Sequence, residues 1–253
     1  MKEKEIPVLL TSSVVAHDSG VALADTDERV RLAIESVAHW LMIDPDLPLV
    51  LCDGSSFDFT PIVRKKFPLA RIECLHFENQ QKMVKQYGRG YGEGEIVRHA
   101  VQNSTLIADA DCFAKCTSKL WVENFQTCLA QWNGKLLCKG VFLDVFSPFK
   151  KTRFAYIDTR FYIASRSYYH QYLEDAHLQI DKGLGRGLEQ CFYDVFIRNR
   201  IHHCLFSTPP IICGVGGGTG VYYKNPLLRR LKERLRLTMV RFKRDFRHMF
   251  SQK

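Results

Sequence analysis

Four glycines alternate with other residues in the most unusual segment of the chain, Gly88-Arg89-Gly90-Tyr91-Gly92-Glu93-Gly94-Glu95. Glycine has no Cβ atom, so a backbone built this way can approach a ligand closely. The residues that follow, 96–101, have helical spacing. Because free N–H groups and the helix dipole both favour an anion at a helix N-terminus, the segment is predicted to be a phosphate-binding loop. A flexible turn is the alternative, although Arg89 and Tyr91 are not typical of a linker.

Spacing excludes two familiar phosphate motifs. The third glycine of G-x-G-x-x-G is Glu93 or Glu95 here, depending on the glycine from which the motif is counted. A second glycine-rich segment, residues 214–220, has no lysine after its last glycine and is therefore not a Walker A loop. The glycines thus indicate a phosphate or a tight turn without naming the ligand.

Two alternatives remain for the polar residues near the middle of the chain. In the first, a strand ends in Asp109 and Asp111, a spacing suited to a divalent cation that bridges a diphosphate. In the second, these aspartates close a helix and the strand follows them, so that Lys115, Thr117 and Lys119 share one face. Two ammonium groups could then neutralise phosphate without a metal. An exposed turn without function is a third interpretation of the aspartates.

Two later segments combine charge with apolar surroundings. Asp158 and Arg160 lie on the same face of an apolar strand, where a charge is costly unless it is paired or used. They are either a structural ion pair or part of an acceptor site. Glu189 stands near the start of a helix, where it either compensates the helix dipole or acts as a general base.

The segments that must position these residues alternate between strand and helix patterns. Strands are expected at residues 6–10, 48–52, 70–77 and 154–164, and at 113–120 if the aspartates close a helix; helices are expected at 29–42, from 60, at 93–103, at 165–173 and from 188. This alternation predicts an α/β fold with a mostly parallel sheet covered on both faces. Ligand sites in such sheets lie at the carboxyl ends of the strands, so Thr11, Asp53 and the glycine run should meet in one crevice.

Composition limits the class of protein. Nine cysteines without any C-x-x-C pair favour free buried thiols in a reducing compartment over a zinc site. The first residues lack the apolar segment of a signal peptide, and no stretch approaches the length of a membrane span. We therefore expect a protein that is neither exported through a signal peptide nor membrane-spanning.

The net charge of +9 is confined to the end of the chain. Residues 224–253 hold 11 of the 36 Lys and Arg residues and two of the 27 acids, which leaves 25 of each in the remaining 223 residues. Apolar residues in this tail recur every three or four positions, at Leu228, Leu231, Leu235, Met239, Phe242, Phe246 and Met249. The pattern predicts a basic amphipathic helix on an anionic membrane surface, with packing on its own domain or in a coiled coil as the alternative. The balanced body argues against a nucleic-acid partner.

Several of these segments together resemble a known family. They are Asp53-Gly54-Ser55, the first glycine run with Ile96, Lys115-x-Thr117-x-Lys119-Leu120, Asp158-Thr159-Arg160-Phe161-Tyr162, Leu188-Glu189, and Gly216-Gly217-Gly218-Thr219-Gly220 with Tyr222. Over residues 6–223 the chain resembles bacterial GT-A-type glycosyltransferase-like proteins from surface-polysaccharide (lipopolysaccharide or capsule) gene clusters. The resemblance implies a nucleotide-sugar donor, a lipid-linked or oligosaccharide acceptor, and work at the cytoplasmic face of the membrane. The strand with Lys115 departs from the family pattern, in which a strand ends in metal-binding aspartates, so a need for Mn²⁺ or Mg²⁺ stays open.

The resulting hypothesis is a cytoplasmic glycosyltransferase, peripheral on the inner face of the cell membrane. It has one GT-A-like α/β domain (residues 1–223) and a basic amphipathic C-terminal helix (residues 224–253). The donor-binding set is Thr11, Asp53, Gly54, Arg89, Gly90, Tyr91, Gly92, Lys115, Thr117 and Lys119; the catalytic set is Glu189 or Asp158 as base with Arg160 orienting a substrate; and Asp109 and Asp111 are the metal candidates. The alternatives are a nucleotidyl- or phosphotransferase that uses the same crevice, and a non-catalytic peripheral membrane scaffold.

Overall fold

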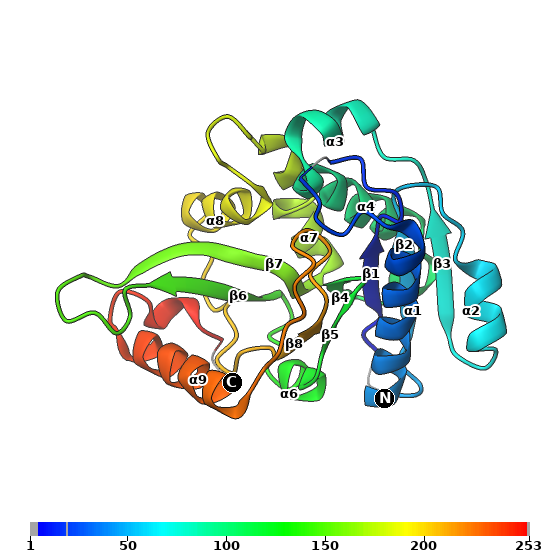
Figure 1. Cartoon of the computed structure of the whole chain (residues 1–253). Coiled ribbons are helices and arrows are strands. Elements are labelled where there is room, and N and C mark those ends of the chain that lie inside the picture. The colour runs from blue at the N-terminus through cyan, green and yellow to red at the C-terminus, as the bar shows by residue number, and fades with distance from the viewer. Residues whose placement is uncertain (1–4, 19, 252–253) are drawn as a thin grey trace.

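The architecture is a central six-stranded sheet with helices on both faces (Figure 1). The computed structural model describes residues 5–18 and 20–251, so residues 1–4 of the amino-terminal stretch and 252–253 of the basic tail lie outside the described part. The strands of the sheet are β1 (Val8–Ser12), β2 (Leu49–Asp53), β3 (Ile72–His76), β4 (Cys112–Thr117), β6 (Leu136–Leu143) and β7 (Arg153–Ser165), and β5 (Leu120–Val122) with β8 (Ile212–Gly214) forms a small second sheet.

The predicted α/β class with a mostly parallel sheet is confirmed. The strand order is β3-β2-β1-β4-β7-β6, in which β1 pairs in parallel with β2 and β4, and β2 pairs in parallel with β3. β7 runs antiparallel to both of its neighbours. Every residue of β1 and β2 is buried, as expected for parallel strands covered on both faces. β4 follows the second of the two alignments predicted for the Asp109 region, because a short helix precedes the strand.

Helices cover the sheet from both sides. They are α1 (Thr26–Ile43), α2 (Thr60–Lys66), α3 (Gln81–Tyr87), α4 (Arg89–Asn103), α5 (Thr105–Ala108), α6 (Phe125–Leu129), α7 (Arg166–Tyr172), α8 (Leu188–Arg198) and α9 (Leu227–Phe242), with 3₁₀ turns η1 (Ala176–Gln179) and η2 (Arg247–Met249). Leu9 and Val50 point into a core shared with α4, α7 and α8, whereas Val8 and Leu10 point into a second core shared with α1 and α6. The alternation of side chains along each strand thus builds one core on each face.

The first glycine run is helical, so the prediction of an open loop with a helix from Glu93 is wrong. Of the four glycines in this run, only Gly88 has a glycine-specific conformation, with φ of 88°, and the helix α4 begins directly after it. Inside α4 the missing side chains allow close packing: a Cβ atom on Gly94 would overlap with the His177 side chain, and one on Gly92 would lie 2.9 Å from the amide nitrogen of Asn79. Such close packing outweighs the cost of glycine in a helix, which is about 1 kcal/mol per residue.

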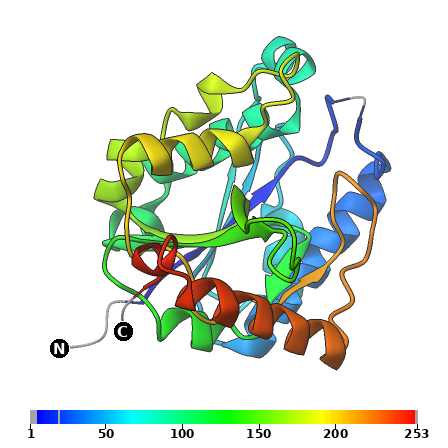
Figure 2. The same ribbon diagram turned by 90° about the vertical axis from the view of Figure 1, so that its left-hand side faces the viewer.

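The basic tail contacts the body of the protein. In Figures 1 and 2, α9 lies on one side of the β6–β7 hairpin and α8 lies on the other. Leu237 and Val240 of α9 are buried in the same core as Met249 and Phe250, which follow the helix. The helix ends at Phe242, earlier than the apolar spacing through Met249 predicted. Within the described residues, no helix has the length and apolar character needed to cross a bilayer.

Candidate functional site

A crevice of about 740 Å³ opens where β1 and β4 end and where α4 and α8 begin. This is the edge of the sheet at which a ligand site was expected, and the volume is in the range of small-molecule sites. Most of the predicted site residues line it. These are Thr11, Arg89, Gly92, Thr117, Lys119, Asp158, Arg160 and Glu189.

Glu93 joins the crevice wall to the buried side of β4. Its carboxylate forms an ion pair with Lys115 and accepts a hydrogen bond from Thr117 Oγ1 at 3.1 Å. The Lys115 ammonium also donates to the carbonyl oxygen of Thr159 at 2.9 Å, and the Lys115 side chain is 1% exposed. Lys115 does not line the crevice and its charge is already neutralised, so the structure does not offer it to a donor phosphate. The carboxylate partner was not among the predicted site residues, although it lies inside the glycine run.

Lys119, unlike Lys115, lines the crevice. It lies in the turn after β4 and not in the strand itself, and it is 3% exposed. Among the described residues its ammonium has neither a hydrogen bond nor an ion pair. Burial and the nearby Arg29 guanidinium lower the pKa of Lys119 to about 7, against the attraction of Asp53 and Glu93. A buried cation without a partner is unfavourable unless a ligand supplies the missing negative charge.

The second glycine-rich segment lies over two cations of the crevice. Gly216, Gly217 and Gly218 all line it. A Cβ atom on Gly217 would lie 3.6 Å from Lys119 Cδ, and one on Gly218 would overlap with the Arg89 guanidinium. Within the described part of the chain, the N–H groups of Gly217 and Gly218 donate to no protein acceptor. This segment has the property that the sequence suggested for the first glycine run, namely bare amides close to charged groups.

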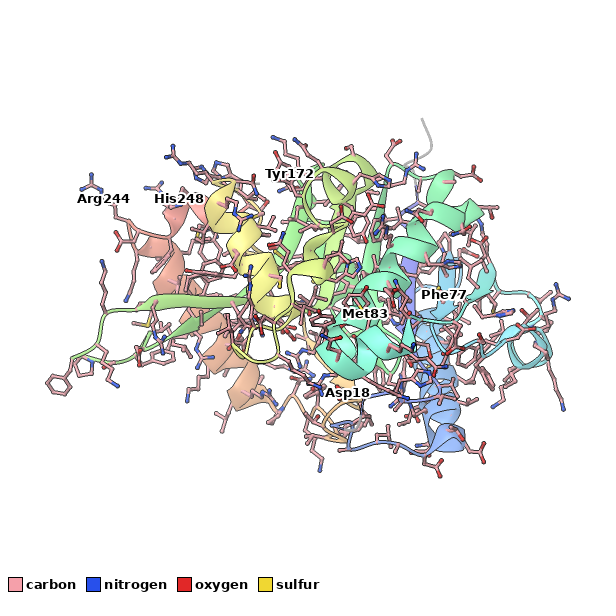
Figure 3. The ribbon with its side chains drawn as sticks, turned by 90° about the horizontal axis from the view of Figure 1, so that it is seen from above. Asp18, Phe77, Met83, Tyr172, Arg244 and His248 are labelled. Carbon is pink, nitrogen blue, oxygen red and sulfur yellow. The ribbon has the colours of Figure 1, made fainter. Side chains whose placement is uncertain are left out.

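The N-terminus of α4 already holds an anion, and that anion belongs to the protein. The Asp18 carboxylate accepts a hydrogen bond from the Arg89 N–H at 3.1 Å and one from Gly20 N–H at 3.1 Å, and Lys182 lies 3.4 Å away. Burial raises the pKa of Asp18, but these bonds and Lys182 outweigh it and lower the pKa. Figure 3 shows Asp18 on the segment that follows β1, near the α3–α4 region. The N-terminus of α4 thus binds a carboxylate of the protein itself.

Asp158 and Arg160 form a two-bonded ion pair at the crevice wall. Arg160 Nε and Nη2 donate to the two Asp158 carboxylate oxygens at 2.8 and 2.5 Å. Burial alone would raise the pKa of Asp158, but Arg160 outweighs it and the pKa falls. Arg160 also stacks on Tyr223, with its Cζ atom 4.9 Å from the ring centre. Since both oxygens of Asp158 are engaged, this carboxylate is poorly placed to accept a proton, and Arg160 is held in one orientation.

Glu189 differs from Asp158 because no lysine or arginine of the described residues forms an ion pair with its carboxylate. It lies in the first turn of α8 and lines the crevice. Burial raises its pKa, and the nearby carboxylates of Glu93 and Asp158 add to this effect. A raised pKa brings a carboxyl group closer to neutral pH, where general bases work best. Of the two predicted bases, the geometry favours Glu189.

Besides Lys115, four of the predicted donor-binding residues lie outside the crevice. Asp53 is fully buried, and its carboxylate accepts N–H groups from Val14, Ser55 and Phe57 at 2.9, 2.7 and 3.2 Å. It therefore holds the two loops that follow β1 and β2, and it does not reach a nucleoside. The other three pack inside the protein: Gly54 against Asn79, Gly90 against Leu188, and Tyr91 against Tyr87 and His177.

The crevice does not contain a metal site of the predicted kind. Asp109 and Asp111 precede β4, so they lie at the end of the strand opposite to the crevice. The carboxylates that line the crevice are Asp18, Glu93, Asp158, Glu189 and Glu233, and within the described residues all of them except Glu189 form an ion pair with a lysine or arginine. No group of three or more His, Cys, Asp or Glu residues suited to a metal ion is found in the described ranges. The described residues thus offer no preformed set of protein ligands for Mn²⁺ or Mg²⁺ at the crevice, and cationic side chains are present to neutralise phosphate.

One wall of the crevice comes from the basic tail, which the sequence had assigned to a separate unit. Side chains of α9 line it together with Lys139 of β6, namely Arg229, Arg230, Lys232, Glu233, Arg234 and Arg236. Glu233 connects the two elements through Lys139 at 2.9 Å, and Arg230 is bound to Glu123 at 2.6 Å. Spacing along the chain gave no indication of this contact, because it depends on how α9 packs against β6.

Comparisons with known proteins found similar structures but no matching sequence family. No family model matches the chain, and no curated protein does. The chain is similar to a protein from Desulfovibrio desulfuricans G20, provisionally named a nucleotide-diphospho-sugar transferase, with 12% identity over 78% of each chain and a TM-score of 0.46. A 4-diphosphocytidyl-2C-methyl-D-erythritol synthase has 13% identity and a TM-score of 0.44 over 94% of this chain and 100% of its own. The bifunctional glycosyltransferase WbbM has 11% identity and a TM-score of 0.43 over 76% of this chain and 37% of its own.

Proposed function

We propose that the chain is a transferase that moves a sugar from a nucleotide-sugar donor to a lipid-linked or oligosaccharide acceptor. The observation that carries the proposal is that Lys119 and Glu189 line the same crevice. Within the part of the chain that the structure describes, Lys119 is a buried cation without a partner, and Glu189 is a carboxylate with a raised pKa and no ion pair. A sugar transfer needs both, a cation for the departing phosphate and a base for the acceptor hydroxyl.

The proposed reaction assigns a role to each of these groups. Glu189 takes the proton of an acceptor hydroxyl, whose oxygen forms a bond to the anomeric carbon while the bond from that carbon to the phosphate oxygen breaks. The nucleotide leaves with an additional negative charge on its phosphate, which Lys119, Arg89 and the amides of Gly217 and Gly218 stabilise. Arg160, fixed by Asp158, orients a substrate. Binding to Lys119 favours its charged form, so the ligand itself restores the proton that burial removes.

The proposal includes peripheral attachment to the anionic inner face of the cell membrane and a place in surface-polysaccharide synthesis. Attachment is supported by the exposed apolar residues of α9, and the pathway rests on the sequence resemblance alone. The basic residues of α9 at the crevice, Arg229, Lys232 and Arg236, would face an acceptor that carries negative charge.

Nucleotide sugars provide the test. Thermal unfolding of the protein is measured against UDP-, GDP-, CMP- and dTDP-sugars, each with Mn²⁺ and with EDTA. We expect one nucleotide class to raise the melting temperature, and we expect EDTA to leave the effect unchanged. Analysis of the products with that donor then separates sugar transfer from nucleotidyl or phosphoryl transfer. Absence of stabilisation by all four classes would refute the proposal.

A further inference from the structure

The outer face of α9 is apolar and uncovered. Five residues form a stripe along it, and we call them the α9 stripe: Leu228, Leu231, Leu235, Met239 and Phe242, all exposed. At about 100° per residue they fall within roughly 80° of the helix circumference. Leu237 and Val240, the residues that bury α9 against the protein, lie on the opposite side. The helix therefore packs through one face and presents a second apolar face to solvent.

Basic residues border the stripe on both sides. By the same helical geometry, Lys232 and Arg236 lie along one edge and Arg234 and Arg241 along the other. Glu233, the acidic residue of α9, is neutralised by ion pairs with Lys139 and Arg236 at 2.9 Å each. The stripe is thus apolar in its centre and positively charged at its margins, which is the pattern of helices that lie in the surface of an anionic bilayer.

The loop between β6 and β7, residues 144–152, continues this surface, and we call it the hairpin tip. Phe149 at the tip is 96% exposed and is followed by Lys150 and Lys151. Phe146 lies beneath the cationic edge of α9, with Lys232 and Arg236 6.0 and 5.7 Å from its ring centre. In Figure 1 the hairpin projects beyond the sheet beside α9, and in Figure 3 Arg244 and His248 lie at the same end of the molecule.

Contacts fix the hairpin tip to the end of α9. Thr152 accepts a hydrogen bond from Lys243, and Lys151 lies 3.1 Å from Asp245. Below them the rings of Phe142 and Phe246 pack edge to face, 5.1 Å apart. Helix and tip therefore form one surface with two apolar parts and a shared set of basic residues.

We propose that the α9 stripe and the hairpin tip together dock on an anionic lipid bilayer, with Phe149 entering the headgroup region. The charge of the surface selects this partner, because a margin of Lys and Arg residues around apolar side chains matches anionic headgroups over acyl chains. Lys232 and Arg236 belong both to this surface and to the crevice wall. If the proposed function holds, the docked crevice faces acceptors held in the bilayer; the docking itself does not depend on catalysis.

Co-sedimentation of the full chain with vesicles tests the proposal. The vesicles contain phosphatidylcholine alone or with phosphatidylglycerol, and the variants are Phe149→Glu, Leu235→Glu and Phe149→Trp. Leu69→Glu is the matched control, since Leu69 is 99% exposed on the far side of the fold beyond α2. Deletion of the tail is unsuitable, because Met249 and Phe250 belong to the core.

We expect the wild type, Phe149→Trp and Leu69→Glu to bind the anionic vesicles and to release with salt. Phe149→Glu and Leu235→Glu should each weaken binding on the order of tenfold or more, since each removes an apolar contact and adds a negative charge. Equal binding by Leu235→Glu and wild type, or wild-type binding to an RNA fragment without any binding to vesicles, would overturn the proposal. Nucleotide-sugar stabilisation, measured on the same samples, reports separately on the crevice.

Discussion

Replacement of Lys119 by methionine should stabilise the protein and weaken its binding of nucleotide sugar. Lys119 is buried and has no partner among residues 5–18 and 20–251, and its pKa falls from an ordinary 10.5 to about 7. Between these two values the unfolded chain binds more protons than the folded one, so the wild type gains stability as the pH rises. Below pH 7 both states are protonated and the full cost of the buried charge is present.

The size of the effect follows from the same two pKa values. At about 1.4 kcal/mol per tenfold change, Lys119→Met should raise the free energy of unfolding by at most about 4 kcal/mol at pH 7 and about 2 kcal/mol at pH 9. The gain over the wild type should therefore shrink as the pH rises. Loss of a charge-assisted bond to phosphate should cost about 1.5–3 kcal/mol, or roughly ten- to hundredfold in affinity.

Lys115 provides the matched control, because it is a second buried lysine four residues earlier in the same region. Its ammonium is paired with Glu93, so Lys115→Met leaves that carboxylate without its cation and should lower the stability by about 1–3 kcal/mol. Urea unfolding of both variants without ligand at pH 6, 7 and 9, and calorimetric titration with the nucleotide sugar that stabilises the wild type, measure these effects. If Lys119→Met is less stable than the wild type at pH 7, or binds the donor equally well, the reasoning on this residue is wrong.

Two further variants test other parts of the site. Gly94→Ala should lower the free energy of unfolding by about 1–2 kcal/mol, because the overlap of the new Cβ atom with His177 outweighs the better helix propensity of alanine. Donor affinity should stay unchanged. Weaker donor binding with unaltered stability would restore the phosphate interpretation of the first glycine run. Glu189→Gln should reduce the turnover number by about 10²–10⁴-fold with little change in donor affinity, and wild-type turnover should fall as the pH drops through the raised pKa of Glu189. An unchanged turnover number for Glu189→Gln would assign the base elsewhere.

The fold could be predicted because its strands and helices are encoded by local patterns. Continuous apolar runs marked β1 and β2, and Asp25 caps α1 by accepting the Glu28 N–H at 2.7 Å. The antiparallel hairpin was harder to find, since β6 is broken by shifts in register next to Lys139 and Phe142 and does not alternate regularly. Patterns along the chain describe single elements well, and they describe the partners of those elements poorly.

The site shows this limit in its charged residues. Lys115 and Lys119 look equivalent in the sequence, but the partner that neutralises Lys115 comes from α4, 22 residues earlier in the chain. Likewise, Asp53 at the end of a parallel strand is typical of a ligand contact, and it is instead saturated by three backbone N–H groups. Whether a charge is free depends on contacts that spacing does not contain. These contacts distinguish the charged side chains that are paired within the protein from those that are available to a ligand in the crevice.

The two glycine-rich segments extend this argument from side chains to backbone. The first was predicted to bind phosphate at a helix N-terminus, but the Arg89 N–H at that terminus donates to the carboxylate of Asp18. The second segment satisfied no motif, yet it lies over Lys119 and Arg89, and two of its amides have no acceptor among the described residues. A helix N-terminus whose N–H groups already bind a carboxylate of the protein needs no ligand. Amides without an acceptor, beside a buried cation without a partner, instead gain the anion that they lack when a ligand binds. On this criterion we expect residues 216–218 to bind the phosphate of the proposed donor, together with the Arg89 side chain from the start of α4.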